Sequence, residues 1–155
     1  MGYNVNTTAV NLTIPADKLD DAVKALKELN QRDDLKTGGA SGPITDGDGK
    51  VIGYGRIDIW FAWMDPQYDQ KLHTVPDIMD AVGFKESEIQ PDGTFELGWY
   101  DNKTGAEEHF LRALAPFVDE GSYVAFEGED GTHWRYFFED GEMRNQTGSI
   151  TYSDD

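Results

Sequence analysis

Apolar and polar residues alternate in several short runs of this chain, a pattern that predicts strands with one buried face. The runs at residues 10–14 and 95–99 are two examples. A third run, at residues 57–63, predicts a central strand of the main sheet. Asp58 in that run indicates that its second face reaches water, which leaves open whether Trp60 is exposed or covered by a helix.

Other segments space their apolar residues three and four positions apart, as amphipathic helices do. Thr74 is placed as the N-cap of one helix, and Gly83 is placed to end it. Thr104 and Glu107 form a Thr-x-x-Glu capping box at the start of another predicted helix. The predicted helices cover residues 19–29, 75–82 and 105–118.

Two Asp-Gly dipeptides, Asp130-Gly131 and Asp140-Gly141, separate alternating runs near the C-terminus and predict two β-hairpins. We also expect a last strand near residues 149–152. Hairpins are antiparallel, so the predicted fold is α+β, with helices packed on one face of a mainly antiparallel sheet. A ferredoxin-like topology is the leading specific arrangement. The 155 residues fit a single α+β domain, residues 1–155.

The pattern dissolves at residues 31–56, where seven glycines predict a Gly-rich loop or a weak hairpin. Asp46 and Asp48 match the first and third ligands of a calcium loop. Val51 and Ile57 stand where such a loop needs Gly and Glu. We therefore expect a turn here, and no metal site.

The chain is strongly acidic, with a net charge of −17. Residues 1–56 hold eight acidic and seven basic residues, whereas residues 57–155 hold 22 and six. This balance disfavours direct binding to nucleic acid or an anionic membrane and favours basic partners. The chain has no cysteine and no window long enough to span a membrane, so we expect a cytoplasmic protein.

No catalytic constellation stands out. His73, His109 and His133 belong to three different elements and match no catalytic or zinc spacing. Carboxylates abound, but thirty of them make chance pairs certain. We therefore expect a protein that is not an enzyme, with no catalytic residues and no cofactor.

Residues 101–143, DNKTGAEEHFLRALAPFVDEGSYVAFEGEDGTHWRYFFEDGEM, resemble a pattern found in small acidic uncharacterised proteins of actinobacteria and their phages. The segment IWFAWMDPQYD resembles them more weakly. The resemblance carries over no catalytic residue. It implies a small accessory protein, encoded by a phage and expressed in a bacterial host.

Together these features predict a binding protein that modulates or inhibits a host protein with a basic surface. DNA mimicry, in which carboxylates take the place of phosphates, is one version. The candidate protein-binding residues are Asp58, Trp60, Glu127, Glu129 and Asp130. The alternative is a small-ligand-binding or enzymatic domain with a pocket near the Gly-rich loop.

Overall fold

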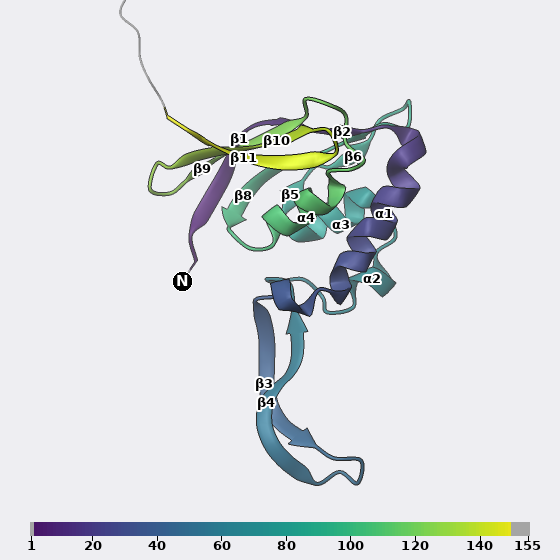
Figure 1. Cartoon of the computed structure of the whole chain (residues 1–155), viewed down its shortest axis with the longest axis vertical. Helices are drawn as coiled ribbons and strands as arrows, with labels where there is room; N and C mark the ends of the chain where they lie inside the picture. The colour runs from purple at the N-terminus through teal and green to yellow at the C-terminus, as the bar shows by residue number, and fades with distance from the viewer. Residues whose placement is uncertain (1, 150–155) are drawn as a thin grey trace, which may run out of the picture.

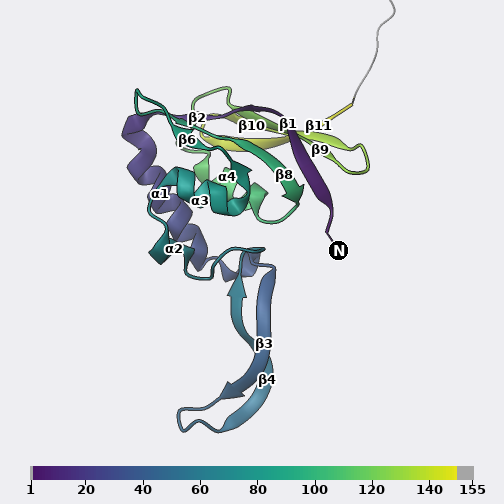
Figure 2. The ribbon, with the colours of Figure 1, turned by 180° about the vertical axis from the view of Figure 1, so that it is seen from behind.

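Six strands form one antiparallel sheet, and the helices of the body lie on one of its faces (Figures 1 and 2). The computed structural model describes residues 2–149. The strand order is β11-β10-β9-β1-β8-β5. This arrangement confirms the predicted α+β fold. The strands are β1 (Asn4–Asn11), β5 (Phe84–Lys85), β8 (Trp99–Lys103), β9 (Tyr123–Gly128), β10 (His133–Glu139) and β11 (Glu142–Gly148).

Helical connections join β1 to β5 and β8 to β9. Helices α1 (Leu19–Glu28), α2 (Tyr68–Lys71) and α3 (Val75–Val82) precede β5, and α4 (Glu107–Leu114) lies between β8 and β9. In the sheet these strands stand in the order β9-β1-β8-β5, with antiparallel neighbours throughout. A β-α-β-β-α-β chain in this order has the ferredoxin-like topology. Strands β10 and β11 extend the sheet beyond β9.

The hydrophobic core fills the space between the helices and the covered face of this sheet. The apolar residues that recur every three or four positions lie on the buried side of each helix, and alternate residues of the strands meet them. Removing these side chains from water is the main stabilising term of the fold. The buried residues of this interface include Ala22, Leu26, Ile78, Met79, Val82, Phe110, Leu111, Leu114, Val5, Tyr100, Val124, Phe126, Tyr136 and Phe138.

The local signals at the turns of the C-terminal half are confirmed. Asp140 and Gly141 both have positive φ, 56° and 74°, and they link β10 to β11 with Glu139 opposite Glu142. Two successive residues with positive φ are what a two-residue hairpin turn requires. The other Asp-Gly pair lies in the turn between β9 and β10. Strand β11 ends at Gly148, and residues 150–152 of the predicted last strand lie outside the described residues.

One of the two predicted helix caps forms, at Thr74. Thr74 Oγ1 accepts a hydrogen bond from the N–H of Asp77 at 3.2 Å, and α3 ends at Gly83. The second capping pair meets in a different geometry, because α4 begins only at Glu107. The Glu107 carboxylate accepts hydrogen bonds from the Thr104 hydroxyl and from the Gly105 N–H, the latter at 2.6 Å. The Glu107 carboxylate therefore accepts hydrogen bonds from two groups that precede the helix.

The alternating run at residues 95–99 forms two strands instead of one. Strand β7 (Phe95–Glu96) joins β2 (Thr13–Ile14) and β6 (Glu88–Ile89) in a small three-stranded sheet, and β8 belongs to the main sheet. Gly98 separates them, where a Cβ would lie 1.7 Å from the carbonyl oxygen of Lys85. The close approach of two backbones excludes any side chain at this position.

The prediction of a central strand at residues 57–63 is wrong. Strand β4 (Val51–Trp60) pairs with β3 (Gly38–Thr45) alone, in a separate two-stranded sheet. The chain leaves β4 after Trp60, and Phe61 enters the core from a turn. Most of the glycine-rich segment is therefore a hairpin and not a loop. We call this hairpin, residues 38–60, the arm, because it extends away from the body (Figures 1 and 2).

Candidate functional site

The arm is a long, regular ribbon despite its glycines. Its register runs from Gly38 opposite Trp60 to Thr45 opposite Val51, with two irregularities where β4 holds an extra residue. The turn at the tip is closed by Asp46, whose Oδ1 accepts hydrogen bonds from the N–H groups of Asp48 and Lys50, both at 2.9 Å. The aspartate that matches the first ligand of a calcium loop thus stabilises a turn.

The arm carries large apolar side chains in contact with water. Tyr54 is 80% exposed, Ile52 is 64% exposed and Val51 is 53% exposed, and Ile44 on β3 is exposed too. These are four of the seven large hydrophobic residues that are exposed in the described part of the chain. Soluble proteins seldom gather such residues on one projecting element without a binding role. The arm is therefore a candidate interaction surface.

The two predicted site residues on β4 lie at the base of the arm. Trp60 is half-buried, and its indole lies against Gly38 of the opposite strand, where a Cβ would stand 2.2 Å from Nε1. Asp58 is exposed, and its Oδ1 accepts a hydrogen bond from the N–H of Ile59 at 3.0 Å. Trp60 therefore packs within the arm. This position differs from both alternatives that the sequence left open, exposure on the main sheet and cover by a helix.

The other predicted site residues lie elsewhere, at the turn between β9 and β10 (Figure 1). Glu127 is half-buried on β9. Glu129 Oε1 accepts a hydrogen bond from the N–H of Asn4 at 3.2 Å, and Asp130 accepts one from the Tyr3 hydroxyl. That hydrogen bond lowers the pKa of the Asp130 carboxyl below its ordinary value. Two of these acidic residues therefore hold the start of β1 in place.

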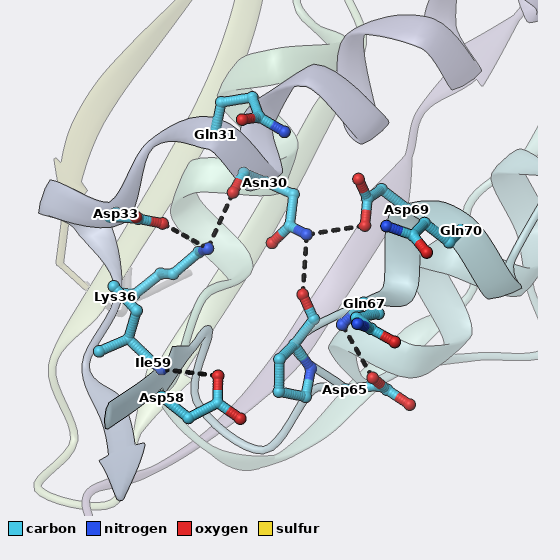
Figure 3. Close-up of a pocket in the computed structure, with 11 residues that line it drawn as sticks. Asn30, Gln31, Asp33, Lys36, Asp58, Ile59, Asp65, Gln67, Asp69 and Gln70 are labelled. Atoms are coloured by element: carbon cyan, nitrogen blue, oxygen red, sulfur yellow. Dashed lines mark hydrogen bonds and ion pairs between the residues drawn. The ribbon is translucent and has the colours of Figure 1, made fainter. Parts of the chain in front are cut away.

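A polar pocket of about 590 Å³ lies where the arm meets the body (Figure 3). We call it the joint pocket. Asp58 and Ile59 line it from the arm, and residues of the segments 30–36, which follows α1, and 65–70, which leads into α2, line it from the body. The joint pocket lies near the glycine-rich segment. A pocket in this region is what the alternative of a small-ligand-binding or enzymatic domain predicts. Its polar lining includes Asn30, Asp33, Lys36, Asp58, Asp65 and Asp69.

Lys36 closes one wall of the joint pocket. Its side chain is 5% exposed, and its Nζ donates to the carbonyl oxygen of Asn30 at 2.8 Å and to Asp33 Oδ1 at 2.6 Å. On another wall, Asp65 pairs with Lys71 at 2.7 Å. The hydrogen bond from Lys71 and that from the Gln67 N–H lower the pKa of the Asp65 carboxyl. These contacts fix the pocket walls.

Sequence reasoning missed the exposed apolar residues of the arm. The signal was present: Val51, Ile52 and Tyr54 follow the Asp48-Gly49 turn, and Ile44 precedes it. The surrounding glycines hid it because they made the segment resemble a flexible loop. The lining of the joint pocket has no comparable local signal, since it comes from residues that are separated by up to forty positions.

No known protein family, curated protein or solved structure matches this chain. Within residues 2–149, no helix is long and apolar enough to cross a membrane. The same residues contain no group of three or more His, Asp or Glu side chains placed to hold a metal ion.

Proposed function

We propose that this chain is a non-enzymatic binding protein whose arm docks on a basic surface of a partner protein in a bacterial host. The exposure of Tyr54 beside Ile52 on a projecting hairpin carries the proposal. Tyrosine is among the residues that most often anchor protein interfaces, because it buries a large area at low entropic cost. Covering the partner's surface in this way would modulate or inhibit the host protein.

The distribution of charge supports a basic partner. The arm holds three aspartates, one lysine and one arginine, so it contributes only −1 to the net charge of −17. The arm can therefore approach a surface with little charge to desolvate, while the body attracts a positive partner over longer distances. Two copies of the chain repel each other, which disfavours self-association through the arm.

Affinity capture from a bacterial lysate tests this proposal if two double variants are compared with the wild type. Ile52→Ser/Tyr54→Ser removes apolar side chains from the arm. Ile89→Ser/Trp99→Ser is the matched control, because both residues are exposed on the body, at 43% and 46%. The wild type and the control should retain one protein in stoichiometric amount, and the arm variant should lose it. Equal retention by all three would contradict the proposal.

A further inference from the structure

We propose that the joint pocket binds a guanidinium group through Asn30 Oδ1 and the carboxylates around it. The proposal concerns a site that the arm shares with the body, and it does not depend on what the apolar residues of the arm contact. Asn30 is 8% exposed, and its Oδ1 has no hydrogen-bond partner among the described residues. A buried acceptor without a partner is costly, so it calls for a donor.

The orientation of the Asn30 amide follows from its neighbours. Its Nδ2 donates to the carbonyl oxygen of Pro66 at 2.9 Å and to Asp69 Oδ1 at 2.8 Å. A carbonyl and an ionised carboxylate can only accept, so the side that faces them must be the NH₂ group. Figure 3 shows Oδ1 directed away from both, toward the Lys36 side of the pocket. A donor bound on that side of the pocket would satisfy Oδ1.

The charge of the lining indicates that this donor is a cation. Four aspartates and one lysine line the pocket, a net charge of −3. Lys36 already binds Asp33, and Lys71 already binds Asp65. Asp58 and Asp69 remain without an ion-pair partner among the described residues. A ligand that supplies both hydrogen-bond donors and positive charge would compensate them together.

The spread of the acceptors favours guanidinium over a metal ion. The described residues contain no cluster of acidic or histidine side chains tight enough for a metal. A guanidinium is planar and carries up to five N–H donors, so it can serve several separate acceptors at once. Because Asp58 belongs to the arm whereas Asn30 and Asp69 belong to the body, the bound group would link the two.

The test follows the Asn30 side-chain amide of the isolated protein by ¹H–¹⁵N NMR during titration with methylguanidinium. The chemical shift change should saturate in the wild type. The affinity for methylguanidinium should be at least tenfold lower in Asp58→Asn/Asp69→Asn. Asn at position 69 can still accept the hydrogen bond from Asn30, so the pocket should keep its shape. The matched control is Asp17→Asn/Asp21→Asn, which removes two exposed charges outside the pocket and should bind like the wild type.

Two further probes complete the test. Tetramethylammonium has the same charge but no N–H donor, so it should leave the Asn30 resonance unmoved. N-acetyl-arginine amide separates the two sources of a guanidinium: tighter binding than methylguanidinium indicates an arginine of a protein, and weaker binding indicates a free small molecule. The proposal is overturned if no probe moves Asn30, if tetramethylammonium acts equally, or if the pocket variant binds like its control. Water would then satisfy Oδ1.

Discussion

The indole of Trp60 rests on the backbone of Gly38, at the point where the two strands of the arm leave the body. A Cβ on Gly38 would lie 2.2 Å from Nε1 of the indole and 2.6 Å from the carbonyl oxygen of Ala62. Only glycine leaves room for the indole here. Trp60, which the sequence marked as an interface anchor, therefore packs on the arm's own base.

Gly38→Ala should displace Trp60 and destabilise the protein. Overpacking of this kind typically costs about 1–3 kcal/mol in the free energy of unfolding. Gly53→Ala is the matched control, because Gly53 lies in the same hairpin and nothing stands within 4 Å of a Cβ there. Thermal melting measures the stability, and the Trp60 indole N–H resonance reports the displacement. An unmoved resonance in Gly38→Ala would refute the contact.

Glu107→Ala should destabilise the start of α4. The carboxylate is 4% exposed and accepts from the Gly105 N–H at 2.6 Å, so its removal leaves that donor without its partner. We expect a loss of about 1–3 kcal/mol in denaturant unfolding. Glu108→Ala is the control, since Glu108 forms a surface ion pair with Arg112, and it should change stability by about 0.5 kcal/mol or less. Equal losses would contradict this role of Glu107.

The Asp130 carboxyl should titrate below the ordinary aspartate pKa of about 3.9, because the Tyr3 hydroxyl stabilises its ionised form. A folded-state pKa that is lowered contributes stability above the unfolded pKa, and this contribution disappears as pH falls through the lowered value. Tyr3→Phe should therefore raise the pKa of Asp130 toward its usual range. Carboxyl ¹³C NMR titration of both proteins checks the change, and an unaltered pKa would show that Tyr3 does not act on Asp130.

Much of the body could be predicted from local sequence signals. The Asp140-Gly141 turn needs two residues with positive φ, and the Thr74 cap needs a side-chain oxygen before a helix. Each signal lies within a few residues of the structure it determines. The full sheet order did not follow from such signals, because strand β5 was not predicted and the predicted central strand at residues 57–63 lies outside the main sheet.

A weak hairpin was one of the two alternatives for residues 31–56, but the pairing of the arm was beyond such reasoning, because alternation identifies a strand and not its neighbour. Residues 57–60 alternate as a strand of the main sheet would, yet residues 58–60 pair with residues 38–40. The joint pocket was equally hidden. Asn30 and Asp69 lie 39 positions apart, and only the packing of α2 beside the end of α1 brings them together.

If the body attracts a basic partner, the association rate constant should fall steeply as salt is raised. Attraction between exposed charges is screened beyond about 8 Å at physiological ionic strength. The dissociation rate constant should change far less, because the apolar contacts of the arm control it. Surface plasmon resonance with the captured partner, at several salt concentrations, measures both rates. Association that does not depend on salt would remove the electrostatic part of the proposal.

Photocrosslinking from the arm tests docking most directly. A photoreactive phenylalanine analogue replaces Tyr54 in one protein and Trp99, the exposed aromatic on the body, in another. After irradiation in bacterial cells, position 54 should crosslink to a single partner protein, and position 99 should not. Crosslinks from position 99 alone would contradict docking through the arm. A product of twice the 17.4 kDa chain mass from position 54 would show that the arm binds a second copy instead of a host protein.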